Sequence, residues 1–329
     1  MTPLRLRRVG AARPRLGLRF SYLQAAVPDH PARPDRRAAL ETSRRRIHDP
    51  LLTGERSVTL PPPLDALREL PLVSCLMVTK SRLSLMKRAV KCFADQSYPR
   101  KELIVVPDDN QSYHEEIERH VEEAGVEHVR VVPTGSGFSL GALRNLSMDA
   151  AAGEIICQWD DDDRYLPDRL MCQVGELFRA GCRACFLSDN LQLLAPDGTL
   201  FWVNWADDGR ARNEYHVFPP SVMLFKDTKF RYPESGHTAF VGEDLALAAD
   251  LFRNVPVASL GGMGCLYLYE FHSRNTLPKE HHYAISRRRS VSNGLVRLWS
   301  TEIRRTMQYH RVPRPVHVHG SDGLVFTIG

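Results

Sequence analysis

The 329-residue sequence lacks any apolar run near the roughly 18 residues that a membrane-spanning helix needs. It also lacks the apolar stretch that would follow the first arginines in a secretory signal. We therefore expect no signal peptide and no transmembrane helix. With 43% hydrophobic and 25% charged residues, the composition indicates a soluble globular protein with a sizeable core.

Paired cysteine motifs are nearly absent as well. The seven cysteines are scattered and odd in number, and several fall in apolar segments. One C-x-x-C, from Cys182 to Cys185, has no second pair and runs into the apolar stretch "ACFLS". The pattern predicts reduced, buried thiols in a cytoplasmic protein, and packing instead of a zinc or redox site.

Two nucleotide-binding fingerprints are also missing. The Gly-rich stretch "TGSGFSLG", residues 134–141, is neither G-x-G-x-x-G nor a Walker sequence, because it has no lysine and follows the third predicted strand. This argues against a Rossmann dehydrogenase. A Gly-rich loop at the start of a helix can still contact a phosphate.

Lysine is absent from the first 50 residues, which hold twelve arginines and four acidic residues, a balance of +8. The whole chain is +5, so the remainder is about −3. Such an arm could bind nucleic acid or anionic lipid, or act as an organellar transit peptide. We favour a poorly specified extension or a misassigned start. With the Pro-rich stretch "LPPPLDALRELP", residues 1–70 are expected to form an arm and linker, partly disordered.

From residue 71 strand-like and helix-like segments alternate, which predicts parallel βαβ units in a doubly wound sheet. The expected strands are 72–79, 102–107, 128–133 and 155–159, and the expected helices are 81–96, 112–123, 142–151 and one that begins near Pro167. We assign residues 71–183 to a nucleotide-binding half.

The pattern changes at about residue 184. Strand-like runs flank a "PDG" turn at 196–198, which predicts a hairpin, and short strands follow to about 225. A helix is expected in "GEDLALAADLFRN" and a strand at 267–271. We assign 184–277 to an acceptor-side half, and 278–329 to a basic extension with one helix near 284–307.

Four consecutive aspartates, Asp160, Asp161, Asp162 and Asp163, follow the apolar segment "IICQW" and precede a helix. Ligands bind at this end of strands in open α/β sheets. A solvated acidic turn is the ordinary interpretation of such a cluster, but its position favours a Mg²⁺ or Mn²⁺ site. In extended chain, Asp160 and Asp162 would point one way and Asp161 and Asp163 the other. Tyr165 stands where an EF-hand needs glycine.

Five ordered stretches resemble the family 2 glycosyltransferases, which have the GT-A fold, a Rossmann-like, mostly parallel sheet with a smaller acceptor-side portion. They span about 71–277: "PLVSCLMVTKSR", "CFADQSYPRKELIVVPDDN", "LGALRNLSMDAAAGEIICQWDDDDRYLPDRL", "VGEDLALAADL" and "YEFHSRNT". The chain departs from the family at "TKSR", where Asn is frequent, and at "VPDDNQS", where V-D-D-G-S is frequent.

The resemblance implies roles for the metal and the base. Asp162 is the first candidate for direct contact with Mn²⁺ or Mg²⁺, and Asp160 or Asp161 would contact ribose or a metal-bound water. The register is open, so Asp160 and Asp163 stay candidate ligands, with His272 nearby. Asp244 matches the general base, at a helix start that favours negative charge, and Glu243 is its alternate or support. As ordinary residues, Asp244 would only cap a helix and His272 would be structural.

The resemblance also implies contacts to the donor nucleotide. Thr79, with Asp108 or Asp109, matches positions that hold the base and ribose, and Arg144 matches a position near the pyrophosphate. Outside this context Arg144 would be an ordinary surface residue.

The function implied is metal-dependent, inverting transfer of a sugar from a nucleotide-diphosphate donor, first a UDP-sugar, to a hydroxyl. The acceptor would be a glycan, a lipid-linked molecule or a protein. Peripheral membrane association stays open, and nucleic acid is not the expected partner. Two alternatives are a metal-dependent nucleotidyl transferase, and a non-enzymatic nucleic-acid-binding or scaffold protein that uses the basic arm.

Overall fold

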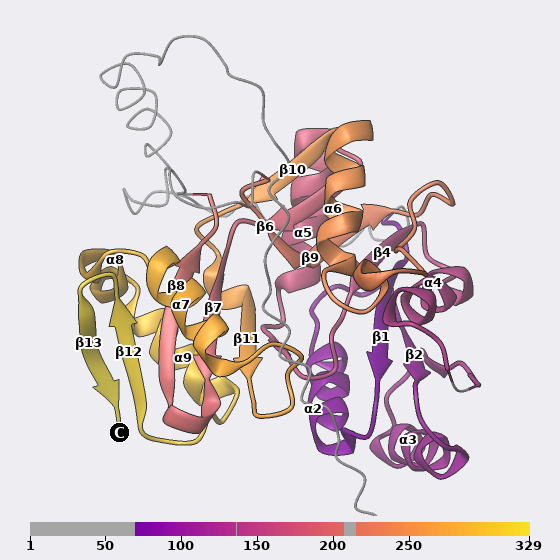
Figure 1. The fold of residues 1–329 in the computed structure, drawn as a ribbon, viewed down its shortest axis with the longest axis horizontal. Coiled ribbons are helices and arrows are strands. Elements are labelled where there is room, and N and C mark those ends of the chain that lie inside the picture. Colours follow the sequence, from indigo (N-terminus) through magenta and orange to yellow (C-terminus); the bar gives the residue numbers. More distant parts are fainter. Residues whose placement is uncertain (1–69, 136, 207–214) are drawn as a thin grey trace, which may run out of the picture. The chain divides into compact units, whose positions relative to one another are not determined.

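The computed structural model describes residues 70–135, 137–206 and 215–329 (Figure 1). The predicted basic arm and all but the last residue of its linker lie outside the described residues. The expected alternation of strands and helices is confirmed from β1 onward.

The first sheet carries the strands predicted in the nucleotide-binding half together with three strands from 184–277, so the sheets do not divide at residue 184 as the predicted halves do. Within the described residues its order is β10-β6-β9-β4-β1-β2-β3, and every adjacent pair is parallel except the two that involve β9. Its strands are β1 (Val73–Thr79), β2 (Lys101–Pro107), β3 (Val129–Val131), β4 (Ile155–Gln158), β6 (Ala184–Leu187), β9 (Phe218–Phe225) and β10 (Val257–Leu260).

Helices cover both faces of this sheet because its central strands bury alternate residues on opposite sides. Cys75 and Met77 of β1 pack in one core cluster with residues of α2 (Leu83–Ala94), α3 (Gln111–Ala124) and α5 (Arg169–Ala180). Leu76 packs in another with residues of α4 (Leu140–Ala150) and α6 (Glu243–Asn254). The α/β class with a mostly parallel sheet flanked by helices is confirmed.

A second sheet, with order β13-β12-β8-β7-β11-β5 among the described residues, forms the other part of the fold. Its strands are β5 (Arg164–Tyr165), β7 (Asp189–Leu194), β8 (Thr199–Asn204), β11 (Tyr267–Phe271), β12 (Val316–Gly320) and β13 (Gly323–Ile328). The hairpin predicted at "PDG" is confirmed: β7 and β8 pair antiparallel across the short 3-10 helix η3 (Ala195–Asp197).

The C-terminal segment differs from the prediction of one helix near 284–307. Three helices occur there, α7 (Lys279–Arg289), α8 (Asn293–Leu298) and α9 (Ser300–Tyr309). The chain leaves the helical path at Ser290, which forms a bridge with Val203, and Ser292 then caps α8. Strands β12 and β13 were not predicted, and β12 pairs in parallel with β8.

Two further 3-10 turns lie beside the later helices and strands, η4 (His237–Ala239) before α6 and η5 (Gly264–Leu266) before β11. Every helix in the described part of the chain is too short or too polar to span a lipid bilayer.

Candidate active site

The predicted site residues gather where three parallel strands end. Strand β1 lies between β2 and β4, so the residues that follow their carboxyl ends share one edge of the sheet (Figure 1). Thr79 ends β1, Asp108 follows β2, and the aspartate run follows β4. This is the edge where open α/β sheets bind ligands.

Arg82, just before α2, holds two of the aspartates. Its Nη2 lies 2.7 Å from Asp161 Oδ1 and its Nη1 lies 2.6 Å from Asp162 Oδ2. His272, just after β11, places Nε2 3.1 Å from the same Asp162 oxygen. Two carboxylates, a guanidinium and an imidazole therefore meet at one point.

Burial and charge separate the pKa values of these two carboxyls. Asp161 is 1% exposed, and burial together with the charge of Asp162 raises its pKa to about 8. Burial acts in the same direction on Asp162, but the hydrogen bond with His272 and the charge of Arg82 outweigh it and lower its pKa. The negative charge is therefore concentrated on Asp162.

The expected alternation of the aspartates along an extended strand is wrong. The chain bends at Asp161 and Asp162 after β4 has ended, so these adjacent side chains reach the same guanidinium. Asp163 points elsewhere. It accepts hydrogen bonds from Tyr267 Oη at 2.6 Å and from the main-chain nitrogen of Glu270 at 3.0 Å.

Arg144 links the aspartate run to the E-D motif. From α4, its Nη1 lies 3.0 Å from Asp160 Oδ1 and its Nε lies 3.0 Å from Glu243 Oε1. Its side chain is 10% exposed and stacks over Tyr232, whose hydroxyl donates to Gln158 Oε1 at 3.0 Å. Arg144 therefore fixes the start of α6 against the end of β4, in contrast to the exposed position expected of an isolated arginine.

Asp244 lies in the first turn of α6, next to this bridge. Gly242 precedes the motif with φ of 81°, a conformation that glycine adopts most easily. Burial, followed by the negative charge of Glu243, raises the pKa of Asp244 to about 7. A carboxyl with this pKa changes protonation near neutral pH, which suits a general base.

The residues expected to hold the nucleoside lie beside β1 and β2. Thr79 is buried, with Oγ1 2.6 Å from the hydroxyl of Tyr113. Asp108 forms an ion pair with Lys80 at 2.9 Å, and Asp109 accepts a hydrogen bond from Ser81. The turn after β1 and the end of β2 are thus joined by polar side chains.

The side chains at this point could coordinate a divalent cation if a bound substrate supplied further oxygen atoms. Asp161 Oδ2 is buried without a hydrogen bond, Asp161 Oδ1 is paired with Arg82 at 2.7 Å, and Asp162 and His272 offer two coordinating side chains. Among the described residues, no group of three or more His, Cys, Asp or Glu side chains could hold a metal alone. Mg²⁺ sites commonly combine one or two carboxylates with substrate phosphates and water.

Sequence reasoning missed Arg82, Tyr113 and Tyr232. Arg82 belongs to the quoted "TKSR" stretch, so the family's opening turn was the available signal for it. The two tyrosines contact the site across 34 and 74 positions of sequence, to Thr79 and Gln158, and no local pattern marks them.

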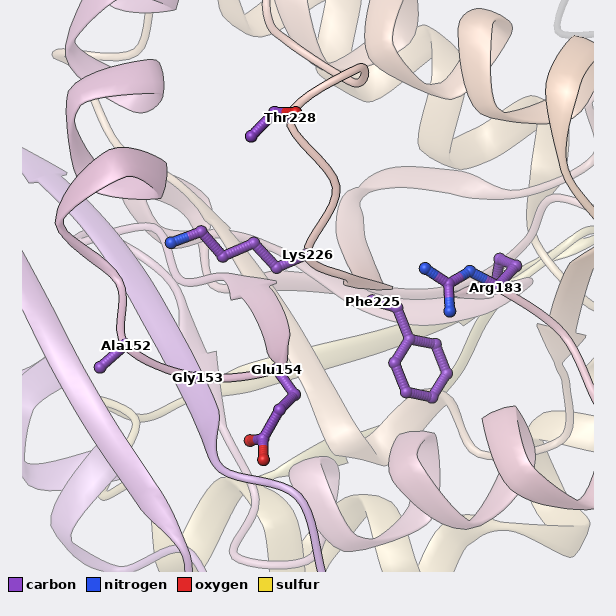
Figure 2. A pocket seen from close by; sticks show the side chains of 7 residues that line it. All are labelled: Ala152, Gly153, Glu154, Arg183, Phe225, Lys226 and Thr228. Carbon is purple, nitrogen blue, oxygen red and sulfur yellow. The ribbon is translucent and has the colours of Figure 1, made fainter.

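A pocket of about 500 Å³ lies at the opposite edge of the sheet, between the starts of β4 and β6 and the end of β9 (Figure 2). Its charged groups are engaged by the fold. Glu154 accepts from the main-chain nitrogen of Leu72 at 2.6 Å, Lys226 donates to the carbonyl of Ala151 at 2.6 Å, and Arg183 stacks over Phe225. We therefore place the candidate active site at the other edge.

Parts of this sequence are similar to known proteins. Residues 74–186 match the family model described as glycosyl transferase family 2. WcaA of Escherichia coli (strain K12), named for colanic acid biosynthesis as a glycosyl transferase, is 32% identical over 160 residues, 49% of this chain and 50% of that protein. TuaG of Bacillus subtilis (strain 168), named for teichuronic acid biosynthesis as a glycosyltransferase, is 27% identical over 129 residues, 39% of this chain and 50% of that protein.

Solved structures give a more distant likeness. S. aureus TarS 1–349 in complex with UDP-GlcNAc has a TM-score of 0.49 at 16% identity, covering 66% of this chain and 64% of that one. The mannosyltransferase PcManGT from Pyrobaculum calidifontis, in complex with GDP-Man and Mn²⁺, has a TM-score of 0.49 at 16% identity, covering 81% and 75%.

The mostly parallel sheet, with polar and charged side chains gathered at the carboxyl ends of its strands, defines an α/β protein of the open-sheet class. More particularly, residues 74–186 are similar to glycosyl transferase family 2, the family that the sequence motifs resemble. The chain spans about half the length of the curated relatives it matches.

Proposed function

We propose that this protein transfers a sugar from a nucleotide-diphosphate donor to a hydroxyl acceptor, with inversion at the anomeric carbon. The observation that carries the proposal is the Asp160–Arg144–Glu243 bridge, which ties the acidic run to the helix that bears Asp244. The bridge therefore holds the candidate donor-binding edge of the sheet and the candidate base in fixed positions relative to each other.

In this proposal Asp162 and His272 hold the divalent cation, with donor phosphate oxygens as further ligands. When bound, Mn²⁺ or Mg²⁺ would neutralise charge on the leaving diphosphate. We leave Asp163 out of this metal shell, because Tyr267 and the main chain of Glu270 engage both of its carboxylate oxygens. Asp160 or Asp161 would contact the ribose or a metal-bound water.

Thr79, Asp108 and Asp109 are proposed to contact the nucleoside. They surround the turn after β1 and already hydrogen-bond with Tyr113, Lys80 and Ser81. A UDP-sugar is the first candidate donor and a GDP-sugar is the comparison.

The transfer needs one proton to move. The acceptor oxygen attacks the anomeric carbon and forms the new glycosidic bond, while the bond between that carbon and the diphosphate oxygen breaks. Asp244 takes the hydroxyl proton, and the nucleoside diphosphate leaves with the bonding electrons. Glu243, held by Arg144, raises the pKa of Asp244 and so its basicity.

The test is a screen of UDP- and GDP-sugars with Mn²⁺ or Mg²⁺, measuring binding and slow donor hydrolysis. We expect metal-dependent release of nucleoside diphosphate from one donor class. Asp162→Asn should abolish metal-dependent donor binding and keep the folded circular dichroism spectrum. Metal dependence that is unchanged in this variant would move the metal site elsewhere.

The products also separate the alternatives. A nucleotidyl transferase would take a nucleoside triphosphate and release pyrophosphate in place of nucleoside diphosphate. A protein that binds nucleic acid and no sugar nucleotide would support the non-enzymatic alternative.

A further inference from the structure

Arg82 occupies the carboxylate oxygen that the proposed metal would need. Resting on the proposed function, we propose that Arg82 is a resident counter-ion that must leave Asp162 when a divalent cation binds. Its guanidinium then pairs with the donor diphosphate, so that metal and nucleotide bind cooperatively. Arg82 is thus a positioning residue for loading of the site.

The competition follows from the shared atom. Arg82 Nη1 lies 2.6 Å from Asp162 Oδ2, and His272 Nε2 lies 3.1 Å from this same oxygen. A cation held by Asp162 and His272 would lie between these donors, beside the guanidinium. Two positive centres cannot share one carboxylate oxygen at this range without strong repulsion.

A counter-ion is needed when no metal is bound. The Asp162 side chain is 14% exposed and that of Asp161 is 1% exposed, so water screens the negative charge at this point poorly. The planar guanidinium spans both carboxylates with separate nitrogens, which a lysine could not do equally well. The pKa of Arg82 changes accordingly: burial lowers it, but the charges of Asp161, Asp162 and Asp160 prevail and raise it.

Arg82 has room to leave without disturbing the fold. Its side chain is 24% exposed, and its backbone (φ −130°, ψ 43°) lies outside the α2 helix, where the side chain makes no capping hydrogen bond. Arg88, one helical turn and a half later, holds the main chain instead. It donates to the carbonyl of Asp162 and pairs with Glu270.

Release of Arg82 leaves a long cation beside the donor site. The turn at Thr79–Arg82 begins with Thr79 and contacts Asp108 and Asp109 through Lys80 and Ser81, so a diphosphate attached to a nucleoside held by these residues would lie near the same turn. Phosphate oxygens accept bidentate guanidinium hydrogen bonds at least as well as carboxylates do. The metal alone must separate an ion pair, whereas the metal with a diphosphate exchanges one partner for another. Linkage then requires each ligand to strengthen the other.

Mn²⁺ titrations followed by electron paramagnetic resonance test this, with and without saturating UDP or GDP. Arg82→Met removes the charge and keeps the side chain's length, and Arg82→Gln is a second variant in case the first does not fold. Lys91→Met is the matched control, since it removes a charge from the adjoining α2 helix, where Lys91 is exposed and pairs with Asp95, outside the aspartate run.

In the absence of nucleotide, Arg82→Met should bind Mn²⁺ about 10-fold more tightly than the wild type, and the gain from added nucleotide should shrink by a similar factor. Lys91→Met should stay within about 3-fold of wild type. Unchanged or weaker Mn²⁺ affinity in both Arg82 variants, with the wild type binding Mn²⁺ and nucleotide together, would overturn this inference alone. A wild type that binds neither Mn²⁺ nor nucleotide would overturn the proposed function with it.

Discussion

Asp244 is the residue whose substitution should distinguish donor binding from the transfer reaction most clearly. It lies beside the Arg144 bridge but makes no hydrogen bond to the residues proposed for the metal. Asp244→Asn should leave donor affinity within a few fold and lower the transfer rate by about 10²–10⁴, the usual effect of losing a general base. Calorimetric donor binding and steady-state transfer on one preparation would measure both.

Glu243→Gln is the informative comparison for this variant, because Glu243 contacts Arg144 and is not the first candidate base. Collapse of metal and donor binding in Asp244→Asn would instead assign Asp244 to the metal site. A normal transfer rate in Asp244→Asn would show that the E-D motif only begins the α6 helix and has no catalytic role.

The raised pKa of Asp244 also predicts a pH dependence of stability. Its pKa rises from 3.8 to about 7 on folding, so the unfolded chain loses this proton first as pH increases. Stability is therefore highest below about pH 4 for this group and is lost as pH rises towards 7. Asp244→Asn should be more stable than wild type at pH 8, with the difference disappearing near pH 4.

Thermal midpoints of the two proteins across this range would measure the effect. The wild-type activity should increase through the same pKa, as the base becomes ionised. A variant no more stable than wild type at pH 8 would show that burial of Asp244 costs the fold nothing.

At the scale of elements, replacing each of two helical glycines by alanine should change the stability of the protein in opposite directions. A Cβ at Gly141 in α4 would lie 1.8 Å from the carbonyl oxygen of Pro233, so the helix and that loop need this glycine to approach each other. A Cβ at Gly175 in α5 would meet nothing within 4 Å.

Gly141→Ala should therefore destabilise the protein by about 1–3 kcal/mol or more through overpacking. Gly175→Ala should stabilise it by about 0.5–1 kcal/mol, because alanine favours a helix. Urea unfolding of both variants gives the comparison. Since α4 also carries Arg144, Gly141→Ala should weaken donor binding too, while Gly175→Ala should not; equal stability of the two variants would contradict the packing.

The strands also show how much of the fold could be predicted from the sequence. Strands β1, β2 and β4 were predictable because burial on both faces gives continuous apolar runs. Strands β12 and β13 were not predicted, although the alternation in "VHVHG" and the turn residues "SDG" were available signals for a hairpin. The location of the aspartate run was predictable from its place after a strand. Its contacts were not, because Arg82 lies 80 positions from Asp162, and Arg144 joins Asp160 to Glu243, which is 99 positions from Arg144.

On the scale of the whole molecule, charge is separated along the chain. Residues 278–329 hold nine Lys and Arg residues and three acidic ones, whereas 51–277 hold 23 and 32. Exposed basic residues of the C-terminal segment include Arg287, Arg288, Arg297, Arg305 and Arg311, with Leu298 and Leu324 exposed near some of them in sequence. An anionic membrane surface would attract such a segment at about 1 kcal/mol per basic residue that approaches it.

This charge distribution predicts salt-sensitive sedimentation with vesicles that contain an anionic phospholipid, and little with zwitterionic vesicles. Replacing Arg287, Arg288 and Arg297 together by Gln should weaken binding about 10-fold or more at low salt, since each contact is lost and surface substitutions of this kind leave the core intact.

Removal of residues 1–56 measures the separate contribution of the arginine-rich arm. Exposed acidic residues are the control: Glu115→Gln and Glu118→Gln on α3 should not weaken vesicle binding. If only the arm deletion reduces binding, the C-terminal segment does not contribute to it; if neither change matters, the basic segments do not mediate vesicle binding.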